Sequence, residues 1–192
     1  MANANTPFGF RPVRDLNGGY VAGGINQYSI PASDNTAVYV GDAVTLAGTG
    51  STINGNYYAD VKIAANTDIV QGVVVGFLAA TRDSTVYRAA STERIALVST
   101  DPNGLFMIQE GGSGTALALN DVGLNINYTV VAGSTVTGYS GTILDNTTEA
   151  GTNTLPLQLV GLANIPNNEV GYYAKWVVRL NRAQFANQVA GA

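Results

Sequence analysis

Short stretches in which apolar and polar residues alternate recur along the chain, and this period of two predicts β-strands with one buried face. The clearest stretch is residues 172–181, whose buried face is expected to carry Ala174, Trp176, Val178 and Leu180. Turn-forming residues separate the stretches, so the chain is predicted to consist of many short strands. The same reading places further strands at residues 26–31, 37–40, 43–47, 57–63, 127–131, 141–144 and 155–162.

Two more stretches extend this pattern. Residues 69–80 are apolar on both faces, which predicts a strand buried on both sides in the middle of a sheet. Residues 95–99 and 105–110 flank the turn sequence DPNG at 101–104, and this arrangement predicts a β-hairpin. Residues 48–56, rich in Gly, Thr, Ser and Asn, are predicted to form a loop.

The fold class that follows is all-β, as a compact β-barrel or β-sandwich. Twenty-three glycines spread over the whole length make long helices improbable. The glycine-rich connector at 111–115 is the best candidate for a boundary between two small lobes. The predicted organisation is an extended N-terminal arm at 1–19, a β domain at 20–181 and a C-terminal tail at 182–192, in which only Phe185 and Val189 show helical spacing.

The N-terminal arm differs from the rest of the chain. Pro7 and Pro12 favour extended backbone before them, and Phe8 and Phe10 would share one side of an extended segment. Phe and Arg are enriched at protein interfaces, so these residues favour docking over a disordered terminus. The predicted docking residues are Pro7, Phe8, Phe10, Arg11, Pro12 and Arg14.

Composition narrows the function classes. The 192 residues are 46% hydrophobic and only 11% charged, so one sizeable core is expected beneath a polar, weakly charged surface. The net charge is −4 and the nine basic residues are scattered, which disfavours nucleic-acid binding. The most apolar run is too short to span a bilayer, and the first residues do not form a secretory signal. We therefore expect a soluble protein, made in the cytoplasm, without a membrane partner.

Catalytic chemistry is hard to build from this sequence. Histidine and cysteine are both absent, which removes the commonest general base, the thiolate nucleophile and most transition-metal ligand sets. Lys62 and Lys175, the two lysines, do not follow a serine at catalytic spacing, and the acidic residues lie mostly in turns. No calcium-loop or phosphate-loop motif is present. The sequence predicts no enzyme activity, no cofactor and no metal.

Five segments of the chain, in this order, resemble tailed-bacteriophage capsid cement proteins, also called decoration proteins. The resemblance extends through most of the chain, and the opening decamer is its most specific part. The segments are ANTPFGFRPV at 4–13, VGDAV at 40–44, GVVVGF at 72–77, DPNGLFMIQE at 101–110 and WVVRLN at 176–181.

This resemblance implies a structural virion protein on the outer surface of the phage head. Such a protein binds the major capsid protein, typically as a homotrimer at three-fold or quasi-three-fold positions, and holds neighbouring capsid subunits together non-covalently. An extended arm is suited to this role because it can add a strand to a partner's sheet. Deletion of residues 2–14 would then leave a folded protein that no longer adds to heads.

Two other functions remain open at this point. The first is a phage tail or head-fibre protein that binds a host glycan through the tyrosines Tyr57 and Tyr58, although core and interface packing also accounts for such residues. The second is a hydrolase that uses a pair of carboxylates, for which the sequence offers acidic residues but no recognisable spacing.

Overall fold

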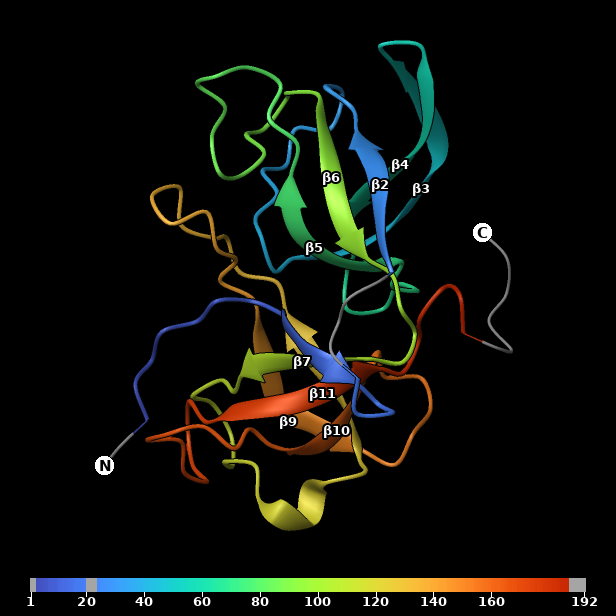
Figure 1. Ribbon diagram of the computed structural model, residues 1–192. Helices are drawn as coiled ribbons and strands as arrows, with labels where there is room; N and C mark the ends of the chain where they lie inside the picture. The colour runs from blue at the N-terminus through green and yellow to red at the C-terminus, as the bar shows by residue number, and fades with distance from the viewer. Residues whose placement is uncertain (1–2, 20–23, 187–192) are drawn as a thin grey trace.

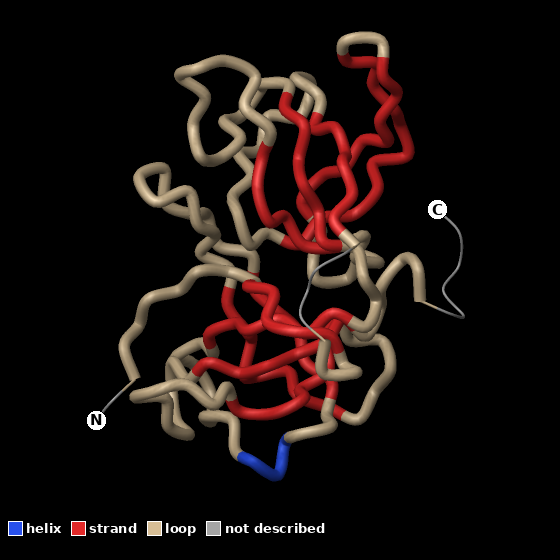
Figure 2. Tube along the Cα trace, in the orientation of Figure 1, coloured by secondary structure: helices blue, strands red, loops and turns tan. Residues whose placement is uncertain are grey.

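Two β-sheets account for nearly all the regular structure of this protein, which confirms the all-β prediction. The computed structural model describes residues 3–19 and 24–186. One sheet is a closed five-stranded barrel and the other has six strands, and they form two lobes stacked one above the other (Figures 1 and 2). A single 3-10 turn, η1 (Leu119–Asp121), is the only helical element of the described residues, and none of them forms a helix long and apolar enough to cross a membrane.

The barrel lobe has the strand order β2-β4-β3-β5-β6. Antiparallel pairing of β2 with β6 closes it, and a parallel bridge between Ser29 and Asp60 joins β2 to β4. The strand β5 pairs with β3 and β6, in agreement with the predicted position in the middle of a sheet. It is shorter than the predicted 69–80, and only its first half is buried, because residues 75–77 are half-buried and residues 78–80 are exposed. The strands are β2 (Ile25–Ile30), β3 (Ala43–Ile53), β4 (Asn56–Ile63), β5 (Gly72–Phe77) and β6 (Arg94–Ser99).

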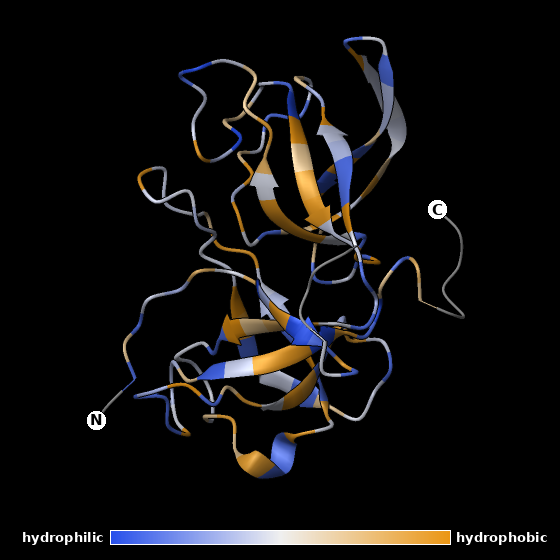
Figure 3. Ribbon diagram, viewed as in Figure 1, coloured by the Kyte–Doolittle hydropathy of each residue, from blue (hydrophilic) through white to orange (hydrophobic). Residues whose placement is uncertain are grey.

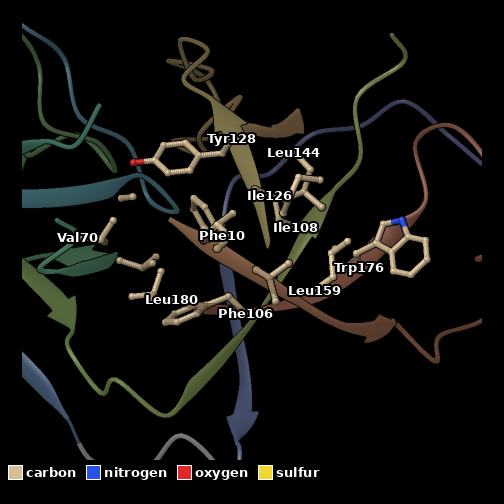
Figure 4. Packing of buried hydrophobic residues seen from close by; sticks show 14 of the residues in the cluster. Phe10, Val70, Phe106, Ile108, Ile126, Tyr128, Leu144, Leu159, Trp176 and Leu180 are labelled. Carbon is tan, nitrogen blue, oxygen red and sulfur yellow. The ribbon is translucent and has the colours of Figure 1, made fainter. Parts of the chain in front are cut away.

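The strands of the sheet lobe pair antiparallel in the order β1-β7-β11-β10-β8-β9, and one isolated parallel bridge joins Glu110 to Leu144. On β11, Trp176, Val178 and Leu180 are buried as the alternation predicts, and they pack in the core that Figure 4 shows. The strands are β1 (Arg11–Asp15), β7 (Gly104–Gln109), β8 (Asn125–Thr129), β9 (Ile143–Ala150), β10 (Leu157–Leu162) and β11 (Lys175–Leu180).

The predicted hairpin at 95–110 is wrong, although its turn forms. The N–H of Gly104 donates to the carbonyl oxygen of Asp101 at 3.0 Å, and the N–H of Asn103 donates to the Asp101 side chain at 2.8 Å. However, β6 pairs with β2 and β5, whereas β7 pairs with β1 and β11. The chain therefore changes lobe at residues 100–103, and not near 111–115, where both flanking strands belong to the sheet lobe.

Residues 48–56 form a hairpin and not the predicted loop. β3 continues to Ile53, and Asn54 and Gly55 make a two-residue turn with φ values of 51° and 81°. The hairpin projects from the barrel and is more polar than β5 and β6 (Figure 3). At its base, the buried Asp60 carboxylate accepts hydrogen bonds from Thr49 Oγ1 at 2.8 Å and Ser51 Oγ at 2.7 Å, which fixes the bulge in β3.

Of the two buried hydrophobic clusters in the described residues, one lies inside the barrel and the other spans both lobes. Val70 and Val73 from the barrel side belong to the same buried cluster as Phe106 and Trp176. The Tyr128 hydroxyl donates to the carbonyl oxygens of residues 64 and 65 at 3.1 and 3.0 Å, which ties β8 to the barrel. Burial across the junction makes the lobes one packed body.

The first residues of the predicted tail also join the lobes. The N–H of Val70 donates to the carbonyl oxygen of Arg182, and the N–H of Gln184 donates to that of Val70, both at 2.8 Å. Residues 182–186 contain no helix, so the helical spacing of Phe185 and Val189 does not correspond to a helix in this part of the chain. Val189 lies outside the described residues, as do positions 1–2 of the arm and 20–23 of the predicted β domain.

Candidate docking surface

The described part of the N-terminal arm lies against its own domain. The side-chain amide of Asn3 donates to the carbonyl oxygens of Glu169 and Tyr172 at 2.8 and 3.1 Å. The N–H of Thr6 donates to Gln109 Oε1 at 2.9 Å, and Lys175 Nζ donates to the carbonyl oxygen of residue 4 at 3.0 Å. The backbone is extended, but it is attached to the sheet lobe before it enters β1.

Phe10 is a core residue, so its prediction as a docking residue is wrong. Its side chain is 2% exposed and lies edge-to-face against Phe106 and Tyr128, with ring centroids 6.3 and 5.5 Å apart (Figure 4). Gly9, with φ of 68°, turns the chain between the two phenylalanines, so Phe8 stays half-buried at the surface while Phe10 points inward. A side chain that fills the core of its own domain is not free to enter a partner.

Arg11 lies between two aromatic rings at the surface. Its guanidinium carbon is 4.9 Å from the ring centroid of Phe8 and 5.9 Å from that of Tyr139. Across residues 3–19 and 24–186, the Arg11 side chain has no hydrogen bond or ion pair. The rings hold the cation by cation–π attraction and leave its N–H donors available to another molecule.

A concave site surrounds this arginine at the junction of the lobes. It has a volume of about 200 Å³. The N-terminal segment contributes one wall, including the half-buried Pro12, and the barrel contributes the other. The lining residues are Phe8, Phe10, Arg11, Pro12, Val40, Val74, Val75 and Tyr139.

Two loops with exposed apolar side chains meet next to Tyr139, which lines this site. Val136 is 89% exposed and Val86 is 60% exposed. Their loops touch, because a Cβ atom added to Gly138 would lie 2.5 Å from the Val86 side chain. Both loops and the N-terminal segment lie on the same side of the molecule in Figure 1. We call this region the docking surface, and it comprises Pro7, Phe8, Arg11, Val86, Val136 and Tyr139.

A buried carboxylate fixes the loop that carries Tyr139. Asp42 accepts hydrogen bonds from the N–H of Tyr39 at 2.8 Å and from the Ser140 hydroxyl. Burial without a neighbouring cation raises the pKa of Asp42 to about 6, and its hydrogen bonds oppose that rise. A backbone hydrogen bond also attaches this loop to the barrel lobe, because the N–H of Val40 donates to the carbonyl oxygen of Gly138 at 2.9 Å.

The six predicted docking residues therefore divide into three groups. Phe8, Arg11 and Pro12 meet at the concave site, with the exposed Pro7 next to Phe8 in the chain. Arg14 is exposed further along the edge strand β1, after a bulge. Phe10 also borders the concave site, but its side chain is buried in the core. The sequence did not predict Tyr139, Val86 and Val136 as part of this surface. Their loops join it through long-range contacts, which no local sequence pattern indicates.

Catalytic interpretations gain no support from the buried acidic groups. Glu110 accepts hydrogen bonds from Trp176 Nε1 at 2.9 Å, from the N–H of Leu117 at 2.8 Å and from the side-chain amide of Asn146 at 3.2 Å. These contacts fix a loop and a core tryptophan. Within the described part of the chain, no three potential metal ligands of the His, Cys, Asp or Glu type come together.

Comparison of the chain with protein-family models, with curated proteins and with solved structures finds no match.

Proposed function

We propose that this protein binds the outer surface of a tailed-phage head and stabilises it by linking neighbouring major capsid subunits. The proposal combines the resemblance of five sequence segments to capsid cement proteins with the docking surface described above. The contact is made through the docking surface on the folded domain, because the N-terminal segment is attached to that domain. Phe10 takes no part in this contact.

The observation that carries the proposal is the exposed Arg11 between Phe8 and Tyr139. A guanidinium held in place by two rings and free of internal partners is complementary to a carboxylate on another protein. Exposed Val86 and Val136, on the two loops that meet next to Tyr139, add apolar contact area. The partner contact is therefore an acidic residue of the major capsid protein, set in an apolar surround.

The buried cluster that spans the two lobes supports a stabilising role. The docking surface includes side chains from both lobes, and the lobes are packed as one body. A rigid body that contacts two capsid subunits resists their separation, and its binding carries little entropic cost because it is already ordered before it binds. Association as a homotrimer would place three such surfaces in one particle and raise the avidity by factors of about 10² to 10⁴.

Binding to heads that lack the protein tests the proposal. Arg11→Ala is expected to weaken co-sedimentation with such heads by at least about tenfold, because it leaves the capsid carboxylate unpaired. Lys62→Ala removes an exposed basic residue from β4 in the barrel wall and serves as the matched control. Equal binding by the two variants and the unaltered protein would rule out Arg11 as the contact. Failure of the unaltered protein to bind heads would reject the proposed function itself.

A further inference from the structure

The β3–β4 hairpin projects from one end of the barrel (Figure 1). A second and larger cleft is lined by residues of this hairpin and of the adjoining ends of β5 and β6. Its volume is about 510 Å³, within the range of about 300 to 1,000 Å³ typical of small-molecule sites. The ends of β-barrels are frequent positions for such sites. The cleft is separate from the docking surface, with which it shares no residue. Its lining residues are Ile53, Asn54, Tyr58, Leu78, Ala79, Ala80, Glu93, Arg94 and Ile95.

The hairpin presents one of two adjacent tyrosines to this cleft. Tyr58 is opposite Ser51 in the β3–β4 register and shares a strand face with Asp60, which binds Ser51. Tyr57 projects from the opposite face and is 87% exposed. The cleft is thus lined by the Tyr58 ring, while Tyr57 lies outside it.

Three polar groups at the cleft have no internal partner. The Tyr58 hydroxyl, the Asn54 amide and the Glu93 carboxylate form no hydrogen bond or ion pair with any residue that the structure describes. Arg94, in contrast, is buried and donates to the carbonyl oxygens of Leu78 and Thr85 at 3.1 and 3.3 Å. Arg94 therefore holds the cleft wall, and the other three groups are available to a ligand.

We propose that this cleft binds a neutral saccharide. One wall is apolar, made by Ile53, Leu78 and Ile95, and the Tyr58 ring offers a flat surface on which the C–H face of a pyranose can stack. Glu93 and Asn54 supply the acceptors and donors that ring hydroxyls require. Because Glu93 and Arg94 carry opposite charges, the site gives an anion or a cation no net attraction, and a neutral polyhydroxyl ligand fits best.

Binding to an array of immobilised oligosaccharides, neutral and sialylated, tests this proposal with the full chain. We expect retention of the protein on neutral saccharides, confirmed by titration with the same oligosaccharide free in solution. Tyr58→Ala is expected to weaken binding by about tenfold. Glu93→Gln, at an exposed position that does not support the fold, is expected to weaken it as well. Tyr57→Ala is the matched control and is expected to bind normally.

Several outcomes would overturn the saccharide site. They are the absence of any retained saccharide, retention of sialylated members alone, and an equal loss of binding in the Tyr57 and Tyr58 variants. A Tyr58 variant that unfolds would be recognised by circular dichroism, and Glu93→Gln then decides the question. Head binding is measured separately: Tyr58→Ala is expected to add to heads like the unaltered protein, so the two proposals fail independently.

Discussion

The N–H of Phe10 donates a hydrogen bond to the carbonyl oxygen of Gly41 at 2.8 Å, and this bond joins the N-terminal segment to the barrel lobe. The next residues form β1 at the edge of the other lobe. The segment thus belongs to both lobes, and the side chain of Phe10 fills the core beside their junction. Close approach of the two backbones at this point depends on glycine at positions 9 and 41.

Gly9→Ala is expected to lower the free energy of unfolding by about 2 to 4 kcal/mol. Gly9 has a φ of 68°, and a Cβ atom there would lie 2.5 Å from the carbonyl oxygen of Gly41 and 2.6 Å from the Ser140 side chain. The substitution therefore combines backbone strain with a steric clash. Urea unfolding followed by tryptophan fluorescence measures the change.

Gly18→Ala separates these two causes. Gly18 has a similarly positive φ of 85°, but a Cβ atom there would meet no atom within 4 Å. Its expected cost is about 1 kcal/mol, from backbone strain alone. If the two substitutions lower the free energy of unfolding equally, the backbone of residue 9 does not pack tightly against Gly41 in solution.

Substitution of the two phenylalanines of the N-terminal segment is expected to lower the free energy of unfolding by different amounts. Phe10→Ala empties a core position between Phe106 and Tyr128 and should destabilise the protein by about 3 to 5 kcal/mol. Phe8→Ala should change stability by no more than about 1 kcal/mol, since Phe8 is half-buried at the surface. If the Phe8→Ala variant binds heads as well as the unaltered protein does, Phe8 is not part of the docking surface.

Two truncations test the attachment of the segment. Deletion of residues 2–6 removes mainly surface hydrogen bonds such as that of Thr6 to Gln109, so the fold should persist. Deletion of residues 2–14 also removes Phe10 and most of β1, so the shorter protein should lose its cooperative thermal transition. The sequence alone had favoured a folded product. A stable protein lacking 2–14 would restore the interpretation of this segment as a separable arm.

Local patterns predicted most strands but not their partners. The predicted strand at 37–40 is wrong, because only isolated bridges form at Val38 and Val40, and β1 was not predicted as a strand. The alternation at Trp176, Val178 and Leu180 reports burial directly, because each residue's exposure follows from the period of the strand. The turn at 101–104 is also encoded locally. Whether β6 and β7 pair across that turn depends on competing edges far away in the chain, and β2, β5, β1 and β11 provide those edges.

The candidate site was predictable to the same limited extent. Phe8 and Arg11 attract notice by residue type, and the structure places them together. Their partner Tyr139 is more than a hundred residues away and reaches them through the bridge of its backbone to Val40. The burial of Phe10 likewise depends on Tyr128, which is distant in the sequence. The spacing of Phe8 and Phe10 predicted the same environment for both, whereas in the structure Phe8 lies at the surface and Phe10 in the core.

Stability should decrease as the pH rises through about 6, because of Asp42. Burial raises the pKa of this carboxyl from 3.8 to about 6 in the folded protein, so the folded state holds the proton more tightly than the unfolded chain. The resulting stabilisation is present in full below the unfolded pKa and is lost as the pH passes the folded one. Burial raises the pKa of Glu110 too, with the same sign.

The contribution of Asp42 to the free energy of unfolding should fall by about 2 kcal/mol between a pH of about 4.5 and one of about 7.5. Urea unfolding of the unaltered protein and of Asp42→Asn at both pH values isolates this contribution, because the variant lacks the titrating proton while an amide can still bridge Tyr39 and Ser140. The variant should show a correspondingly smaller loss of stability on going to the higher pH. The same loss in both proteins would mean that Asp42 does not hold its proton at the lobe junction, and that the hydrogen bonds from Tyr39 and Ser140 outweigh the effect of burial.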